Sequence, residues 1–187
     1  MSNQIKIAVT LIILNCFPIQ SLFSQNDSGV VCIPPYMGGV LAGMSTEREI
    51  VKLFGNGVYL DTLGDTGSRF YSNRDRTISI IVQFSTDRRV SNFTMLLGFY
   101  PPHQLSPKEY PSLITDFIDY HGLLENYLGD DSHEVINWIG KPQKETVDGL
   151  TIIWLYESKC HCELRSWIQF KIIKNKIVAI SVSHDFG

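Results

Sequence analysis

Two similar stretches of sequence decide the fold: Gly43-Met44-Ser45-Thr46-Glu47-Arg48-Glu49-Ile50-Val51-Lys52-Leu53-Phe54-Gly55 and Gly129-Asp130-Asp131-Ser132-His133-Glu134-Val135-Ile136-Asn137-Trp138-Ile139-Gly140-Lys141-Pro142. Each has a capping residue, an acidic residue three positions later, apolar residues at helical spacing and a terminal glycine. Thr46 with Glu49, and Asp131 with Glu134, can satisfy the first free amides of a helix reciprocally. Gly55 and Gly140 can adopt the left-handed conformation that ends a helix. The sequence therefore predicts two short amphipathic helices, offset by roughly 85 to 88 residues.

After each predicted helix the hydrophobic pattern changes to alternation, which indicates strands. In the first copy we predict strands at 58–63, 68–72, 77–84 and 89–97. In the second copy we predict strands at 143–147, 150–156, 166–173 and 177–183. The turns between them carry the Gly, Asn and Asp residues that tight hairpins require, so consecutive strands should pair antiparallel.

The repeated order of elements predicts an α+β fold of two tandem repeats. Each repeat is expected to be a short helix or helix pair packed on one face of a three- to four-stranded antiparallel sheet. We assign residues 25–98 to the first repeat, 99–111 to a Pro-rich linker and 112–187 to the second repeat.

A further helix is predicted in the second copy, where apolar residues recur at helical spacing from Leu113 to Leu128. We expect this helix to pack beside the helix that contains Val135. The corresponding region of the first copy, 30–41, contains two prolines and is less plainly helical.

The first 24 residues have the three parts of a secretory signal peptide. Lys6 precedes an apolar run at 7–14, and small residues follow at Ser21 and Ser24. That run is too short to span a bilayer, and no later stretch reaches the about 18 apolar residues of a membrane helix. We therefore expect a protein secreted or exported to the periplasm, with no transmembrane segment after removal of the signal peptide at 1–24. Asn15 stands where lipoprotein signals favour a small residue, so we expect no lipid anchor at Cys16.

The charge balance and motifs disfavour several functional classes. The chain has 16 basic and 19 acidic residues and a formal net charge of -3. It lacks the clustered Lys and Arg that nucleic acids or anionic membranes demand. It also has no serine nucleophile elbow, phosphate-binding glycine loop or zinc-protease helix. We therefore expect no nucleic-acid partner, no cofactor, no catalytic residues and no enzymatic activity.

Three cysteines would remain after signal removal: Cys32, Cys160 and Cys162. In an oxidising compartment we expect a disulfide between Cys32 and either Cys160 or Cys162, because a bridge across one intervening residue would be strained. The alternative function is a small metal-binding or redox module centred on Cys160 and Cys162. The cluster is Cys160-His161-Cys162, which His184 and Asp185 near the C-terminus could join, with a histidine elsewhere in the chain completing a metal site. Structural zinc sites usually have wider ligand spacing, so the sequence favours the disulfide and assigns no metal ligands.

Alternation within the strands predicts one sheet face that the helices cover and an opposite face that stays open. The covered face should carry Ile78, Ile80, Val82, Phe84, Ile168, Phe170, Ile172, Val178, Ile180 and Val182. The open face would bind a protein partner, because aromatic side chains supply large contact areas at little entropic cost. The predicted partner-binding residues are Trp167, Gln169, Lys171, Trp154, Tyr156, Ile81 and Gln83. The other interpretation is an inert solvated face on which Trp167 packs against Lys171.

The order of elements from Gly38 to Val182 resembles a known superfamily: a helix with a glycine stop, a four-stranded meander with aromatics in its second strand, and a short charged hairpin. The residues that carry the resemblance are the segment 129–142, Gly149, Trp154, Tyr156 and the turn at Asn175. The superfamily contains the β-lactamase inhibitory protein, which has two tandem copies, and single-copy outer-membrane-assembly lipoproteins. The resemblance implies a tendency to bind proteins with the sheets. The inhibitory protein's disulfide spacing and the lipoproteins' attachment signal are not reproduced here.

Overall fold

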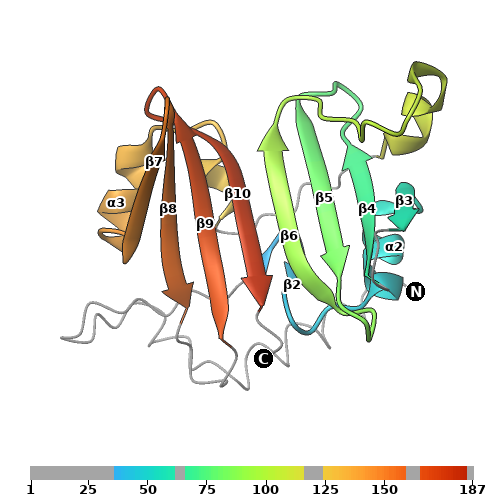
Figure 1. The fold of residues 1–187 in the computed structure, drawn as a ribbon, viewed down its shortest axis with the longest axis horizontal. Coiled ribbons are helices and arrows are strands. Elements are labelled where there is room, and N and C mark those ends of the chain that lie inside the picture. Colours follow the sequence, from blue (N-terminus) through green and yellow to red (C-terminus); the bar gives the residue numbers. More distant parts are fainter. Residues whose placement is uncertain (1–35, 62–65, 116–123, 159–164, 185–187) are drawn as a thin grey trace, which may run out of the picture.

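Eight antiparallel strands form one continuous sheet in the computed structural model, which describes residues 36–61, 66–115, 124–158 and 165–184 (Figure 1). The strand order is β3-β4-β5-β6-β10-β9-β8-β7. The helices and strands are β1 (Tyr36–Met37), β2 (Val40–Leu41), α2 (Glu47–Phe54), β3 (Val58–Asp61), β4 (Gly67–Ser72), β5 (Ile78–Phe84), β6 (Val90–Leu97), η2 (Pro107–Leu113), η3 (Glu125–Tyr127), α3 (Ser132–Ile139), β7 (Lys144–Asp148), β8 (Thr151–Ser158), β9 (Ser166–Ile173) and β10 (Lys176–His184). The architecture is α+β and mostly sheet, with a few short helices.

The eight predicted strands are confirmed, each to within two residues at either end. Their arrangement differs from the two separate sheets that we expected, because β6 and β10 pair antiparallel and join the two halves. Five residue pairs, from Leu96 and Ala179 to Asn92 and Ser183, form this junction. A separate sheet in each half would have left β6 and β10 as exposed edges with unpaired backbone groups. Pairing these strands removes both edges.

Both predicted helices form where the capping residues place them. Thr46 caps α2 in a capping box with Glu49, and Gly55 ends the helix at a φ of 82°. Asp131 caps α3, and Gly140 ends it at a φ of 91°. The Asp131 carboxylate accepts a hydrogen bond from the His133 amide at 3.0 Å. Unlike α2, α3 has no capping box, because no hydrogen bond among the described residues joins the Asp131 amide to the Glu134 carboxylate.

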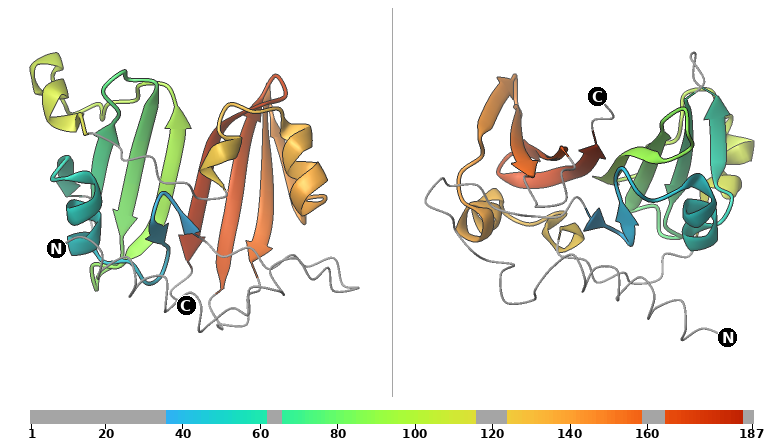
Figure 2. Two further views of the ribbon diagram at one scale, coloured as in Figure 1. Left: turned by 180° about the vertical axis from the view of Figure 1, so that it is seen from behind. Right: turned by 90° about the horizontal axis from the view of Figure 1, so that it is seen from below.

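The helices and the β1–β2 hairpin lie on the same side of the sheet (Figure 2). The strand residues beneath them form the core, in which Val82, Phe93, Ile168, Phe170 and Ile180 are completely buried. This confirms the covered face predicted for β5 and β9. In β10 the prediction was wrong at one position, because a β-bulge between Ile177 and Ala179 shifts the alternation. Ile177 is therefore buried, and Val178 is only half-buried.

The connection between the halves is less helical than we predicted. Ile114 is extended and ends the 3-10 helix η2, so no helix runs continuously from Leu113. Pro111 lies inside η2 and cannot donate the backbone bond that an α-helix requires. Residues 116–123, the middle of the predicted helix, lie outside the described residues, and η3 follows them. In the first half, the region around 36–41 forms the β1–β2 hairpin rather than a helix.

Candidate functional site

The face of the sheet opposite α2 and α3 is the candidate site, and we call it the open face. It faces the viewer in Figure 1, and no α-helix of the described residues lies on it. Strand pairing places its residues in three rows that cross the sheet. The rows are Ser68-Gln83-Asn92-Ser183-Trp167-Glu157, Phe70-Ile81-Thr94-Ser181-Gln169-Leu155-Lys144 and Ser72-Ser79-Leu96-Ala179-Lys171-Ile153-Thr146.

The centre of the open face is polar, where β6 meets β10. The hydroxyls of Thr94 and Ser181 lie 2.8 Å apart across this junction. Thr94 Oγ1 also donates to Asn92 Oδ1 at 2.7 Å. Gln169 follows Ser181 in the same row and is half-buried. The junction of the two halves therefore presents hydrogen-bonding groups along several neighbouring strands.

Apolar side chains flank this polar centre on both sides. Phe70 and Ile81 lie in the first half, and Leu155 and Ile153 lie in the second half. All four are half-buried, so each retains surface that a binding partner can cover. The pattern is a polar centre with apolar flanks, and it spans both halves of the sheet.

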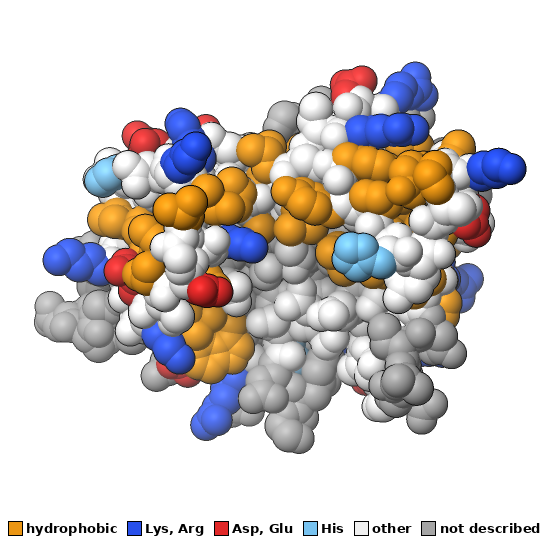
Figure 3. Space-filling model, turned by 45° about the horizontal axis from the view of Figure 1, so that its top comes forward, with side chains coloured by type: hydrophobic (Ala, Val, Ile, Leu, Met, Phe, Trp, Pro, Cys, Tyr) orange, Lys and Arg blue, Asp and Glu red, His pale blue; other side chains and the backbone are white. Residues whose placement is uncertain are grey.

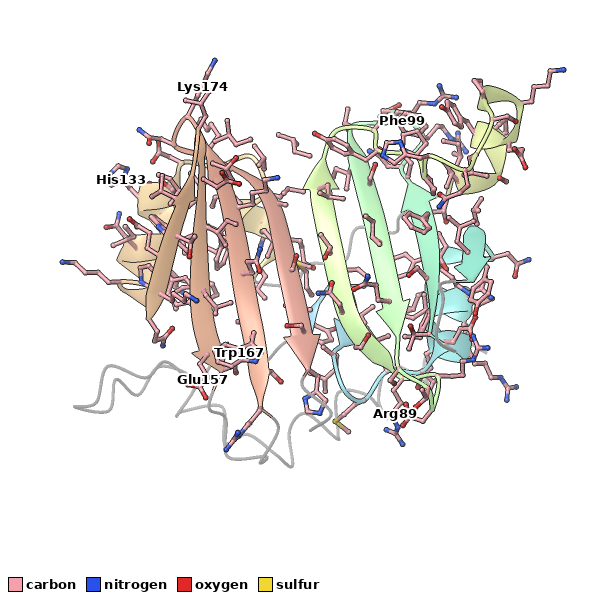
Figure 4. All side chains as sticks on the ribbon, viewed as in Figure 1. Arg89, Phe99, His133, Glu157, Trp167 and Lys174 are labelled. Atoms are coloured by element: carbon pink, nitrogen blue, oxygen red, sulfur yellow. The ribbon has the colours of Figure 1, made fainter. Side chains whose placement is uncertain are left out.

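Trp167 lies near one end of the open face, beside Glu157 of β8 (Figure 4). Its neighbour in the other direction along the row is Ser183 of β10. Trp167 is half-buried, whereas Lys171 on the same strand is exposed. A large aromatic group and a cation are thus displayed on one strand of the open face.

Five of the seven predicted partner-binding residues lie on the open face: Trp167, Gln169, Lys171, Ile81 and Gln83. The prediction was wrong for Trp154 and Tyr156, which alternate onto the covered face and are 6% and 3% exposed. Trp154 Nε1 donates to Glu145 Oε2 at 2.7 Å. Tyr156 Oη donates to the Gly140 carbonyl at 3.0 Å, and burial raises its pKa. Both side chains therefore have structural roles on the covered face.

Sequence reasoning missed the corresponding tyrosine in the first half. Tyr71 Oη donates to the carbonyl of Gly55, the residue that ends α2, at 3.2 Å. Burial raises the pKa of Tyr71 to about 12. The available signal was an aromatic residue 16 positions after each helix-ending glycine.

A second apolar region lies at the end of the sheet, in the segment predicted to be a linker. Phe99 and Tyr110 make an edge-to-face contact with 5.3 Å between ring centroids. The guanidinium of Arg76 lies 5.0 Å from the Phe99 ring centroid, and Tyr100 is 56% exposed. Figure 3 shows apolar side chains gathered near Lys and Arg at this end of the molecule. Ser79 fastens the segment to the sheet, because its hydroxyl donates to the Gly98 carbonyl and accepts from the Tyr100 amide, both at 2.8 Å.

The predicted cysteine cluster lies outside the described residues, since Cys32, Cys160 and Cys162 all fall in segments that the structure does not describe. Within the described ranges, no group of three or more His, Cys, Asp and Glu residues is arranged to hold a metal ion. His184 is described, and its Nδ1 lies 3.5 Å from Ser166 Oγ. The disulfide and the metal or redox alternative stay predictions. In the part of the chain that the structure describes, no helix has the length and apolar character of a membrane span.

Comparison with known proteins found one structural likeness. No protein-family model and no curated protein matches the chain. The chain is similar to a DUF4309 family protein (YjgB) from Bacillus subtilis subsp. subtilis str. 168, seen in a crystal structure. The two share 10% sequence identity with a TM-score of 0.49, and the likeness covers 84% of this chain and 89% of that chain. A likeness of this degree assigns neither a family nor a function.

Proposed function

We propose that this protein is an exported, non-enzymatic binding protein that holds a protein partner against its open face. The observation that carries the proposal is the pattern of that face: hydrogen-bonding groups along the β6–β10 junction, half-buried apolar side chains on both flanks, and Trp167 near one end. Protein interfaces combine these features, because buried aromatic and aliphatic contacts supply affinity while polar groups fix the orientation.

No α-helix of the described residues covers the open face, and this supports the same proposal. Antiparallel sheets can leave one face solvated, and residues of that face are then usually polar, while apolar residues point to the covered face. Here Phe70, Ile81, Ile153 and Leu155 interrupt the polar character of the solvated face. The resemblance to the superfamily of the β-lactamase inhibitory protein points in the same direction.

We further propose that the two halves are tandem copies of one unit. Matched backbone bonds support this proposal. The Gly43 amide donates to Val90 O and the Gly129 amide donates to Ile177 O, both at 2.8 Å. The first amide of α2, from Glu47, donates to Arg88 O at 2.9 Å, and the first amide of α3 donates to Asn175 O at 2.8 Å. Two copies would give the open face its two apolar flanks around a shared polar centre.

Export through a signal peptide at 1–24 is part of the proposal and has a direct test. We expect the N-terminus of the protein recovered from outside the cytoplasm to begin after Ser24, which intact-mass analysis would measure. Recovery of the full 187-residue chain from the cytoplasm would contradict export.

Binding at the open face can be tested with charge-matched variants. The partner would first be isolated by affinity capture from the exported proteins of the source organism. Its affinity for purified variants would then be measured by calorimetry. We expect Lys171→Glu on the open face to weaken binding about tenfold or more, and Trp167→Ala to have a similar effect. Lys52 is an exposed residue of α2, so Lys52→Glu makes the same charge change outside the open face and should leave the affinity unchanged.

Thermal unfolding of each variant would separate lost contacts from lost structure. Lys171 is exposed, so its replacement should leave the unfolding temperature close to that of the wild type. Equal affinity of the wild type, Lys171→Glu and Trp167→Ala would count against the open face as the binding surface.

A further inference from the structure

The edge strand β7 is the most exposed strand of the sheet. All five of its residues, Lys144–Asp148, are exposed, and it is last in the strand order (Figure 1). Val147 is 63% exposed, and Leu150 in the following turn is 80% exposed. These two are the most exposed large apolar side chains of the described residues. The edge therefore combines free strand surface with uncovered apolar groups.

The outer side of β7 also has unused hydrogen-bonding groups. One side of the strand pairs with β8 from Lys144 to Asp148. No described residue forms a hydrogen bond with the backbone on its other side. Natural sheets usually protect such an edge or use it to pair with another strand. The opposite edge strand, β3, differs because its side chains from Val58 to Leu60 are half-buried.

The charges of β7 are complementary to themselves. Lys144, Thr146 and Asp148 alternate onto the same face, with the cation and the anion at equal distances from Thr146. A two-fold axis through Thr146 would pair β7 with a second β7 in antiparallel orientation. Lys144 of each copy would then lie directly opposite Asp148 of the other. Opposite charges at directly facing positions stabilise an antiparallel pair, and like charges destabilise it.

We propose that β7 is a homodimerisation edge, at which two copies of this chain pair antiparallel about Thr146 and extend the sheet from one molecule to the other. Glu145 does not oppose this pairing, because its carboxylate already accepts a hydrogen bond from Trp154 Nε1 at 2.7 Å. In this register Val147 lies opposite Glu145 and loses part of its exposed surface. A two-residue shift that centres the pairing on Glu145 would instead place two carboxylates face to face. The charge pattern therefore favours the register about Thr146 over the register about Glu145, and the partner is a second copy.

This proposal does not depend on the partner-binding function of the open face. A closed two-fold interface uses the same strand on both subunits, so each charge pair occurs twice. Reversing one charge consequently turns two attractive pairs into two repulsive ones. That duplication makes the edge testable with single substitutions.

The test is sedimentation of the purified full chain and its charge variants. We expect the wild type to dimerise at concentrations up to about 100 µM. Lys144→Asp and Asp148→Lys should each weaken the dimer about tenfold or more, because two pairs become repulsive. An equimolar mixture of these two variants should form a heterodimer, since each supplies the charges that the other needs. The double variant Lys144→Asp/Asp148→Lys should dimerise like the wild type.

Lys52→Asp on α2 is the matched control, and it should dimerise like the wild type. Circular dichroism would verify that every variant is folded, as expected for substitutions of exposed side chains. A monomeric wild type at about 100 µM would overturn the proposal. A dimer that survives Lys144→Asp would also overturn it, because the interface would then lie elsewhere. Failure of the mixture to form a heterodimer would refute the register about Thr146.

Discussion

The N-terminal half, described over 36–61 and 66–115, and the C-terminal half, described over 124–158 and 165–184, share one hydrogen bond between helix and sheet but differ in the packing around it and at their outer edges. In each half a tyrosine on the second strand donates to the carbonyl of the glycine that ends the helix, 16 residues earlier. Where α2 packs on the sheet, the ring centroid of Phe54 lies 5.5 Å from that of Tyr71 and 5.9 Å from that of Phe93. The last residue of α3 is instead the aliphatic Ile139. The hydrogen bond from the tyrosine to the helix-ending glycine is thus retained in both halves, while the core packing around it changes.

The outer edges differ more strongly than the cores. In the first half, the guanidinium groups of Arg69 and Arg88 lie 5.1 and 5.7 Å from the centroid of the Tyr59 ring on β3. In the second half, β7 has no aromatic residue and all its side chains are exposed. In each half the tyrosine hydrogen bond ties the end of the helix to the sheet, and losing such a bond is costly. Edges are free to change, and a bare edge is available for a new contact.

The largest expected effect comes from the core difference. Phe54→Ala should destabilise the protein by about 3–5 kcal/mol, because the side chain is buried and packs on two aromatic rings. Ile139 is the matching residue of α3, and Ile139→Ala should lower the free energy of unfolding by less, about 2–3 kcal/mol. Urea unfolding of both variants measures the difference. An equal cost would show that the aromatic cluster adds nothing beyond its buried area.

The tyrosine hydrogen bonds to the helix-ending glycines should contribute equally to the stability of the two halves. Tyr71→Phe and Tyr156→Phe each remove one hydrogen bond to a glycine carbonyl, and each should cost about 1–2 kcal/mol at neutral pH. Unequal costs in urea unfolding would break the proposed equivalence of the two halves. Lys52→Ala, at an exposed position of α2, is the control and should change stability little.

The same tyrosines predict an alkaline loss of stability. Burial raises the pKa of Tyr71 to about 12, so the folded protein favours the neutral phenol while the unfolded chain ionises near 10.0. This contribution is complete below pH 10 and is lost as the pH rises from 10 through 12. Tyr71→Phe should therefore flatten the decline of the unfolding free energy in that range. An unchanged decline in both tyrosine variants would show that other groups cause it.

Local patterns predicted the elements of the fold but not their assembly. The helices follow from capping residues and glycine stops, and the strands follow from alternation, so both depend on neighbouring residues. The β6–β10 junction joins residues far apart in sequence, such as Thr94 and Ser181, and no local pattern encodes it. The bulge after Ile177 reverses the alternation within one strand. The candidate site has the same limitation in sequence. Trp167 and Tyr156 lie on opposite faces of the sheet, but this follows only from the pairing of β8 with β9, which no local pattern encodes.

The stability of the edge formed by β3 should depend on Tyr59. Arg88 Nη1 donates to its hydroxyl at 2.6 Å, and the Arg69 guanidinium lies 5.1 Å from the ring centroid. Tyr59→Ala should cost about 1 kcal/mol, because partly exposed cation–π contacts are individually weak. Thr146→Ala truncates an exposed side chain of β7 and should cost less when measured on the monomer. Equal costs would remove the distinction between the two edges.

The smallest expected effect concerns the N-cap side chains, a neutral hydroxyl in the first half and a carboxylate in the second. Thr46 caps α2 with a hydroxyl, whereas Asp131 caps α3 with a carboxylate. The hydrogen bond from the His133 amide lowers the pKa of Asp131 below its usual 3.8. A group with a lowered folded pKa contributes stability above its unfolded pKa and loses it as the pH falls through the folded pKa. Acid should therefore weaken the cap that Asp131 supplies to α3.

Asp131→Asn isolates this contribution, because asparagine is also a good N-cap residue but carries no charge. Above pH 3.8 the wild type should be more stable than Asp131→Asn, and the difference should shrink as the pH falls below that value. Urea midpoints recorded from about pH 6 to about pH 2 measure the convergence. A pH-independent gap between the wild type and Asp131→Asn would show that the second cap acts without its charge.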